Sequence, residues 1–354
     1  MNTFKVSLIA AGIATLFTTA VVAEETRPFT YLPDGGYPST TDATFVAPSA
    51  KTPLKVGDKI SNLTARNFNG DVIVQKLTDN AYWVQIGFYN TVFLVGDDGV
   101  LLMDPLAYGS GEAVLAAIAD VTDKPVTAVV YSHHHEDHIG DISVFEKAAK
   151  DAGVKLEIIA TDATAKGMKA HGSEVTPATK ELKFSGDSFT FGDETITVYG
   201  LADSAHTYDS ALWILENAKI AHIPDVVNPD QMPYLNFGGS DTFEGYEDNL
   251  AFIKAKEWTY FSGGHGNIGS KADFTFMQEY VADLKAATGD ALGSVNPGDY
   301  FVAKYNNHQA SAKAYYDAIT AKAMDTLRPK YGEFYGFEAS VPDQIVMVRD
   351  AISH

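Results

Sequence analysis

Residues 131–141 constrain this chain more than any other stretch, because they place four histidines and three acidic residues within nine positions. Successive side chains of an extended strand alternate in direction, so His133 and His135 are expected to point the same way. Asp137 and His138 follow where the chain is expected to turn into a helix, and they can face a second metal ion. Imidazole and carboxylate together suit zinc or a similar borderline divalent metal. The stretch therefore predicts a metal site at the end of a buried strand.

The spacing His133-x-His135-x-Asp137-His138-x-Gly140 resembles the signature of the metallo-β-lactamase-fold hydrolases. The alternative is a polar surface turn that happens to be rich in histidine, but helix capping or solubility would not need this spacing. The resemblance implies an α/β protein with a four-layer αββα sandwich. It also implies a dinuclear metal centre, with further ligands at the ends of later strands.

Three later residues match the remaining ligands that the resemblance implies. His206 lies in the sequence AHTYDS, Asp225 follows the strand expected at 219–223, and His265 stands between glycines. Three histidines on the first metal leave a fourth position open for water, as a catalytic zinc site requires. Asp225 stands where lactonase, glyoxalase and phosphodiesterase relatives carry an aspartate that bridges both metals. The implied ligands are His133, His135 and His206 for the first metal and Asp137, His138, Asp225 and His265 for the second.

Three other polar residues near these strands are interpreted differently. His134 points away from the face that carries its two histidine neighbours. His222 is interpreted as a strand histidine unrelated to the metals, with ligation as the less favoured reading. Asp104 ends a buried strand, and it can either orient a metal ligand from behind or simply terminate the strand before Pro105.

Alternating strand and helix patterns between residues 71 and 288 favour an α/β fold. The expected strands are 72–74, 81–86, 91–95, 100–103, 126–131, 156–160, a hairpin over 184–199, 211–215, 219–223 and 258–262. The expected helices are 111–120, 142–152, 162–171, 242–256, 271–287 and 309–327. A break rich in Gly and Pro is expected at 289–298, and a tail at 328–354.

These patterns and an export signal at the N-terminus together divide the chain into four parts. The N-terminus has a short basic start, an apolar run and a small-residue cleavage site before Glu24, which is typical of an export signal. The parts are a signal peptide (1–23), an extended N-terminal arm (24–70), a catalytic domain of the metallo-β-lactamase fold (71–288) and a C-terminal helical extension (289–354). The mature protein is expected to be periplasmic or secreted, with no attachment to a membrane after cleavage.

Composition narrows the choice of partners. The chain has 354 residues, 45% of them hydrophobic, and a formal net charge of −20. Such a surface repels phosphate backbones, so nucleic acid is not expected as a partner. The chain has no cysteine, which excludes disulfides and a thiolate ligand or nucleophile. A small-molecule substrate is expected, and assembly into a homo-oligomer is left open.

The function that the resemblance implies is a secreted dinuclear zinc hydrolase that attacks the carbonyl of a lactone or ester. Two metals about 3.5–4 Å apart would share a bridging hydroxide, which Asp137 and Asp225 would orient as catalytic residues. Fe or Mn could replace the two zinc ions. The alternatives are a β-lactamase, a sulfate or phosphate ester hydrolase, and a di-iron relative that performs redox chemistry.

Five residues are candidates for the substrate pocket. Phe88 and Tyr89 lie at a hairpin tip, where related enzymes carry a flap. Asn228 stands where lactamases often carry a lysine that holds the substrate carboxylate, so the β-lactam alternative is weakened. Tyr208 and Tyr234 are candidates to polarise a carbonyl oxygen, although either could simply pack.

Overall fold

The structure is a computed structural model, and it describes residue 33, residues 36–203 and residues 205–353. The predicted signal peptide, residues 1–23, lies outside the described residues, as does the beginning of the predicted N-terminal arm. Within the described part of the chain, no helix is long and apolar enough to cross a membrane.

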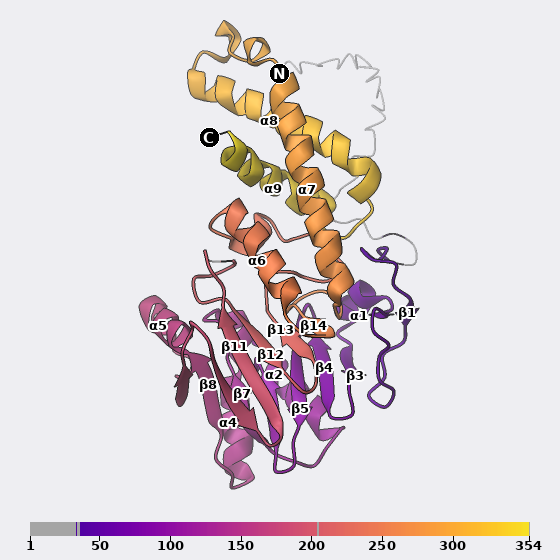
Figure 1. Cartoon of the computed structure of the whole chain (residues 1–354), viewed down its shortest axis with the longest axis vertical. Helices are drawn as coiled ribbons and strands as arrows, with labels where there is room; N and C mark the ends of the chain where they lie inside the picture. Colours follow the sequence, from indigo (N-terminus) through magenta and orange to yellow (C-terminus); the bar gives the residue numbers. More distant parts are fainter. Residues whose placement is uncertain (1–32, 34–35, 204, 354) are drawn as a thin grey trace, which may run out of the picture.

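Two mixed sheets form the centre of the molecule (Figure 1). The strands of the first sheet, in spatial order, are β3 (Val72–Lys76), β4 (Ala81–Ile86), β5 (Tyr89–Val95), β6 (Val100–Met103), β7 (Val126–Val130), β8 (Glu157–Thr161) and β9 (Lys180–Leu182). Those of the second sheet are β10 (Asp187–Phe191), β11 (Glu194–Gly200), β12 (Ala211–Leu215), β13 (Ile220–His222) and β14 (Tyr260–Ser262). The strands expected from the sequence are thus present, with ends that differ by at most three residues.

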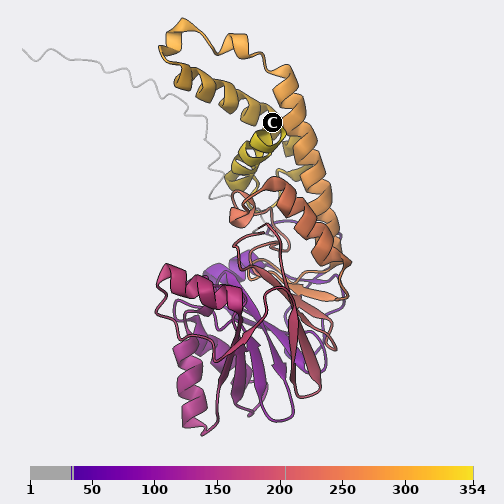
Figure 2. The ribbon, with the colours of Figure 1, turned by 60° about the vertical axis from the view of Figure 1, so that its left-hand side comes forward.

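Helices cover the outer face of each sheet, so the predicted four-layer α/β sandwich is confirmed (Figure 2). The first sheet is covered by α2 (Ser110–Ala119), α4 (Ile142–Asp151) and α5 (Asp162–His171), and the second by α6 (Phe243–Ala255) and α7 (Lys271–Ser294). Apolar side chains fill the space between the sheets, Trp83 and Trp213 among them. Because the inner faces are apolar, the polar ligand residues can lie only at the rim of the sandwich.

The predicted C-terminal helical extension is confirmed, with α8 (His308–Tyr331) at the helix expected over 309–327, but the helices are longer than the sequence pattern predicts. The break expected at 289–298 begins later, because α7 continues through Gly289 to Ser294. Instead of a tail at 328–354, α8 runs past residue 328 and α9 (Phe337–Ile352) follows it. Figure 1 shows these helices extending beyond the sheets. They pack on α7 through apolar side chains such as Leu284, Leu327 and Ile345.

The described part of the predicted arm is mostly extended, but it contains three short elements. They are β1 (Phe45–Val46), which pairs in parallel with β2 (Lys59–Ile60), and the helix α1 (Leu63–Asn69). The segment runs beside β3 and β4 in Figure 1. It is attached to the sandwich by a buried ion pair between Lys59 Nζ and Asp273 Oδ1 at 2.5 Å.

Strand direction places the ligand loops at one rim. In the second sheet β11, β13 and β14 run in the same direction, because β12 is antiparallel to β11 and β13 and β14 is parallel to β13. The loops after these three strands therefore emerge at the same edge, and they carry His206, Asp225 and His265. The strand β7 delivers the histidine-rich stretch, with α3 (Glu136–Ile139) directly after it.

Candidate metal centre

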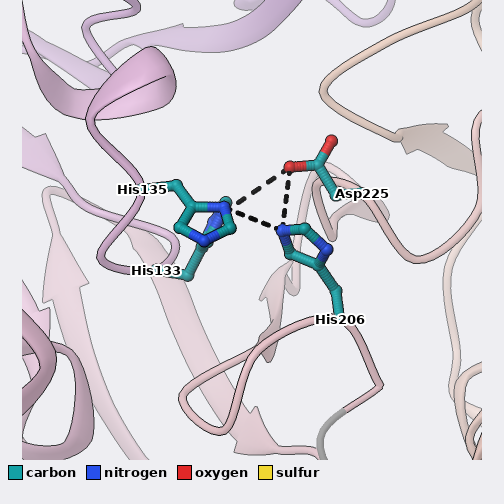
Figure 3. A group of neighbouring side chains, drawn as sticks. All are labelled: His133, His135, His206 and Asp225. Carbon is teal, nitrogen blue, oxygen red and sulfur yellow. Dashed lines mark hydrogen bonds and ion pairs between the residues drawn. The ribbon is translucent and has the colours of Figure 1, made fainter. Parts of the chain in front are cut away.

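The first group of ligand atoms comes from three loops. His133, His135, His206 and Asp225 each offer one atom, and these atoms lie within 4.8 Å of one another. His206 Nε2 is 3.0 Å from His135 Nδ1 and 3.3 Å from Asp225 Oδ2. Figure 3 shows the rings of His135 and His206 meeting below the carboxylate. Four donors pointing at one another around a common centre suit one divalent ion.

The second group lies against the first and shares its neighbour Asp225. Asp137, His138 and His265 each offer one atom within the same 4.8 Å limit. Asp225 Oδ2 is 3.0 Å from His138 Nε2, and Asp225 Oδ1 is 3.1 Å from His265 Nε2. One oxygen of Asp225 thus faces His133, His206 and His138, and the other faces His265. All seven ligands expected from the sequence are brought together, in two clusters consistent with a dinuclear metal site.

Hydrogen bonds on the far side of the rings determine which nitrogen faces the centre. His265 Nδ1 lies 2.7 Å from the carbonyl oxygen of Phe88, and His206 Nδ1 bonds the carbonyl oxygen of Gly238. Because a carbonyl only accepts, each Nδ1 carries the proton, and each Nε2 keeps a lone pair for a metal. His133 Nδ1 bonds Ser132 Oγ at 2.9 Å, which leaves its Nε2 directed at Asp225.

The donor atoms fit a metal ion on two observations. His133 Nε2 and His138 Nε2 are buried, and neither forms a well-aligned hydrogen bond among the described residues, although Asp225 Oδ2 lies 3.6 and 3.0 Å away; buried polar atoms normally have such a partner. The donors are imidazole nitrogens and carboxylate oxygens only, which zinc and similar divalent ions accept. A metal would satisfy both buried nitrogens, so the residues present fit the group.

The pKa values of several ligand side chains are strongly shifted. Burial, reinforced by His206, lowers the pKa of His135 to about 4, and burial also lowers that of His133. Burial alone would lower the pKa of His138, but the carboxylates around it, Asp225 above all, raise it to about 9. Burial alone would raise the pKa of Asp225, yet His138 and His265 hold it well below its usual range. His133, His135 and Asp225 are thus already in the deprotonated state that metal binding needs, whereas His138 must give up a proton.

Close approach of the backbone makes the centre compact. Asp225 has a φ of 67°, a left-handed conformation that aspartate tolerates better than most residues. At Gly264 φ is 76°, and a Cβ added there would lie 2.9 Å from His138 Cε1 and 2.7 Å from Pro224 Cβ. No larger residue fits at this position without displacing a ligand.

A buried chain of hydrogen bonds connects the histidine-rich loop to the loop of His265. Asp104, with 0% of its surface exposed, accepts from the backbone N–H of Ser132 at 2.8 Å and from His222 Nε2 at 2.9 Å. His222 Nδ1 lies 3.1 Å from Ser262 Oγ, which donates to Asn90 Oδ1. Asn90 in turn donates to the carbonyl oxygens of Gly264 and Gly266.

This chain decides the two alternatives left open for its members. Asp104 supports the residue before His133 rather than a ligand itself, and His222 bonds Asp104 and Ser262 and is absent from both ligand clusters. Sequence reasoning missed Asn90 and Ser262, because no spacing signal marks either residue.

The side chain of His134 makes a second connection between loops. His134 Nδ1 lies 2.7 Å from Asp209 Oδ1, and Thr207 Oγ1 donates to the same oxygen. Asp209 was not expected to take part, and only its position after His206 could have marked it. Tyr208 stacks on His134 with ring centroids 5.3 Å apart and is not among the residues lining the cavity at the metal centre. We therefore assign Tyr208 no part in the substrate pocket.

A cavity of about 820 Å³ opens over the metal centre. Its lining includes four of the five pocket candidates, namely Phe88, Tyr89, Asn228 and Tyr234. The ring of Tyr89 lies against a ligand, with its centroid 4.6 Å from that of His265. Burial and the neighbouring Asp137 carboxylate raise the pKa of Tyr89, so its hydroxyl stays protonated.

Comparison with protein families and solved structures agrees with this geometry. A model of the Metallo-beta-lactamase superfamily matches residues 85–265, a span that contains all seven ligands. A metallo-beta-lactamase from Pontibacter korlensis is 16% identical with a TM-score of 0.50, over 60% of this chain and 99% of its own. The metallo-beta-lactamase IND-7 is 21% identical with a TM-score of 0.50, over 60% of this chain and 98% of its own. At these identities the likeness shows the fold alone.

One relative is named for a different activity. Over 88 residues, 24% of this chain, the sequence is 31% identical to the 2,4-dinitroanisole O-demethylase subunit beta of Nocardioides sp. (strain JS1661). The match spans only 28% of that relative's length.

Proposed function

The chain belongs to the metallo-beta-lactamase superfamily of metal-dependent enzymes, and we propose that it is a dinuclear zinc hydrolase acting on the carbonyl of a lactone or ester. The observation that carries the proposal is the position of Asp225. Its Oδ2 lies 3.3 Å from His206 Nε2 of the first ligand group and 3.0 Å from His138 Nε2 of the second, and its Oδ1 lies 3.1 Å from His265 Nε2 of the second group. A carboxylate placed in this way supports two ions side by side, which is the arrangement of two-metal hydrolases.

The chain's own residues supply binding and proton handling. Two zinc ions, when bound, supply Lewis acidity and make a water molecule acidic enough to act as a nucleophile near neutral pH. Asp137 has 28% of its side chain exposed and lines the cavity, so its carboxylate can accept a hydrogen bond from that water and orient it. Tyr89 remains protonated beside Asp137 and can donate a hydrogen bond to an oxygen of the substrate.

The lining of the cavity supports a carbonyl substrate over the charged alternatives. Sulfate and phosphate esters carry anionic oxygens that enzymes usually hold with Arg or Lys. None of the described residues that line the cavity is Arg or Lys. Asn228 is present where a lactamase would often place a lysine for the substrate carboxylate. The likeness to solved lactamases shows the fold alone and does not favour β-lactams.

The test is a substrate screen of the purified protein, loaded with zinc and compared with a chelator-treated sample. Lactones, neutral aryl esters, a chromogenic β-lactam, sulfate esters and phosphotriesters would be compared, together with 2,4-dinitroanisole because of the partial relative. We expect turnover of lactones or esters, lost on chelation and reduced at least about a thousandfold by Asp137→Ala and His133→Ala. Turnover of another class alone would refute the proposal, and two bound irons with a redox-dependent absorption would favour the redox alternative.

We also propose that the protein is exported, on the basis of its N-terminal sequence. Expression of the full chain in a Gram-negative host should yield a periplasmic product whose N-terminus is near Glu24. A cytoplasmic product that keeps Met1 would contradict this.

A further inference from the structure

We propose that the cavity selects an uncharged substrate with an apolar non-reacting part, and that residues 36–67 together with Tyr335 form the selecting wall. The bond that is cleaved rests on the proposed function above. The selection for an uncharged, apolar group rests on the cavity itself. A volume of about 820 Å³ lies within the range of roughly 300–1,000 Å³ that is usual for small-molecule sites.

One wall of the cavity comes from outside the family's core, and none of its side chains is charged. Residues 36–67 contribute the apolar Tyr37, Phe45, Ile60 and Leu63 together with neutral polar residues such as Asn62 and Asn67, and the C-terminal region contributes Tyr335. Both segments lie outside residues 85–265, which the family model matches. Shape and polarity on this side are therefore properties of this chain, and the ligand set does not determine them.

The wall is fixed to the sandwich by hydrogen bonds to two neighbouring residues, Asn267 and Asp230. The backbone N–H of Ile60 donates to Asn267 Oδ1 at 2.9 Å, and Asn267 Nδ2 donates back to the carbonyl oxygen of Ile60 at 3.0 Å. The backbone N–H of Thr40 donates to Asp230 Oδ1 at 3.0 Å. Such pairing at Asn267, two residues after His265, holds the wall at a constant distance from the metal centre.

Tyr335 meets the other end of the same wall. Its ring lies edge-on to that of Tyr37, with centroids 5.0 Å apart, a geometry that aromatic pairs favour. The carbonyl oxygen of Tyr335 accepts from the backbone N–H of Met232 at 2.9 Å. The N-terminal segment, the C-terminal region and the loop after Asp225 thus close one pocket around the site.

Charge in the cavity excludes an anionic tail. No described residue in its lining is Lys or Arg, whereas Asp230 is present away from the ligand clusters. A carboxylate on the non-reacting part of a substrate would lose its water without gaining a cationic partner, and it would face Asp230. An apolar group in the same place gains from contact with the aromatic wall.

Asn228 adds one neutral polar contact. Its Oδ1 is buried and has no hydrogen-bond partner among the described residues, although the residue lines the cavity. Buried amide groups normally have partners, so Asn228 has hydrogen-bonding capacity left for a bound molecule. Its Oδ1 can accept a hydrogen bond from an amide N–H or a hydroxyl group, and it provides no charge for a carboxylate.

The test compares two esters that differ in one charge, 4-nitrophenyl butyrate and the mono-4-nitrophenyl ester of succinic acid, with the zinc-loaded protein. We expect kcat/KM for the neutral ester to exceed that for the acid by roughly tenfold or more. In Leu63→Lys a cation enters the wall, and the ratio should fall by about tenfold through a lower KM for the acid. The matched control is Val56→Lys, which adds the same charge at a residue that is 59% exposed and not part of the lining.

A second variant guards against misfolding of Leu63→Lys, and a binding measurement tests the pocket without relying on hydrolysis. Tyr234→Lys, at a lining residue that is 62% exposed, should shift the ratio in the same direction without disturbing the fold. Binding without hydrolysis is measured by calorimetry with two anilides that correspond to the esters, the neutral butyranilide and the anionic succinanilic acid. If neither ester is hydrolysed, the proposed function fails while the anilides still test the pocket. Equal or tighter binding of the acid, or equal effects of Leu63→Lys, Tyr234→Lys and Val56→Lys, would overturn the inference.

Discussion

Single residues act at this centre mainly through the atoms that face away from it. His206 and His265 are oriented by carbonyl oxygens. The residue before His133 is held by Asp104, and Asp104 is held by His222. A ligand whose ring is already oriented loses less entropy when it binds a metal. Residues that touch no metal ligand should therefore still change metal affinity.

Replacing His222 tests this chain of contacts. In His222→Phe, Asp104 Oδ2 and Ser262 Oγ lose a buried partner, which should lower the free energy of unfolding by about 1–3 kcal/mol. Zinc affinity should fall by about tenfold, because the loops of His133 and His265 are no longer connected. Urea unfolding of the chelated protein and competitive zinc titration measure the two effects. In His222→Gln, which can keep one of the two hydrogen bonds, the unfolding free energy and the zinc affinity should both lie between those of His222→Phe and the wild type. Unchanged zinc affinity in His222→Phe would argue against a positioning role.

Asp209 provides a prediction about acid stability. Burial alone would raise its pKa, but hydrogen bonds from His134 and Thr207 hold it below the usual value of 3.8. A carboxyl whose pKa is lower in the folded than in the unfolded state stabilises the protein above the unfolded value, and that contribution is lost as the pH falls through the folded value. Asp209→Asn should thus destabilise the metal-free protein by about 1–3 kcal/mol at pH 6.

The difference in unfolding free energy between Asp209→Asn and the wild type should shrink as the pH falls below 3.8. Urea unfolding at several pH values between 6 and 3, with chelator present, measures it. A difference that stays constant with pH would show that Asp209 contributes without its charge.

At the scale of elements, the loops that follow parallel strands carry the ligands, and glycine allows those loops to come close together. The loop after β14 contains Gly264 at a φ of 76° and Gly266 at 74°. Its neighbour after β13 holds Asp225, whose backbone N–H donates to the carbonyl oxygen of Gly263 at 3.0 Å. Two loops packed backbone to backbone leave no room for a side chain between them.

Gly264→Ala should disrupt the second ligand group. The new Cβ would lie 2.9 Å from His138 Cε1 and 2.7 Å from Pro224 Cβ, and the backbone would be strained at its positive φ. We expect a loss of about 1–3 kcal/mol in unfolding free energy, with one rather than two zinc ions bound per chain. Thermal unfolding and metal analysis after dialysis measure these effects, and two tightly bound ions in the variant would contradict the geometry.

The control is a glycine in a helix with space around it. Gly289 lies inside α7, and a methyl group added there would meet Ile352 Cδ1 at 3.8 Å, which is ordinary van der Waals contact. Gly289→Ala should therefore stabilise the protein by up to about 1 kcal/mol, as alanine does in helix interiors. Destabilisation instead would indicate that the chain breaks near this residue, as the sequence pattern suggested.

At the scale of the whole molecule, segments from both ends of the chain meet at the pocket. Gln344 in α9 donates to the carbonyl oxygen of Pro233 at 2.5 Å, in the loop that follows Asp225. At the other end, Lys59 and Asp273 form an ion pair with side chains 1% and 2% exposed. The N-terminal segment and the C-terminal helices thus support the site from outside the family's core.

The buried ion pair predicts how firmly the N-terminal segment is attached. Lys59→Met leaves the Asp273 carboxylate without its cation, which should cost about 3–5 kcal/mol of stability. Adding Asp273→Leu should recover much of that loss, because the pair is then replaced by apolar groups. The recovery is not complete, because Asp273 also accepts a hydrogen bond from the backbone N–H of Ser270 at the start of α7. Denaturant unfolding of the single and double variants measures this, and additive losses would show that the two residues act independently.

The types and order of the metal ligands are determined by the sequence alone. Alternation along a strand and glycine at tight turns are local properties, so His133, His135, His206, Asp225 and His265 could be assigned from spacing and resemblance. The two-sheet α/β sandwich followed from the alternation of strand and helix for the same reason. The end of α7 could not be placed, because glycine weakens a helix only slightly when tertiary contacts hold it.

Only the tertiary structure decided what surrounds those ligands. The hydrogen bonds of Asp104, His222, Ser262 and Asn90 join four strands or strand ends that are far apart in sequence, and no local pattern encodes such a meeting. The same holds for the pocket wall, where Tyr37 of the N-terminal segment contacts Tyr335 although the two residues are far apart in sequence. Local spacing determines the chemistry of a side chain and its direction on an element, whereas its partners depend on how the elements pack.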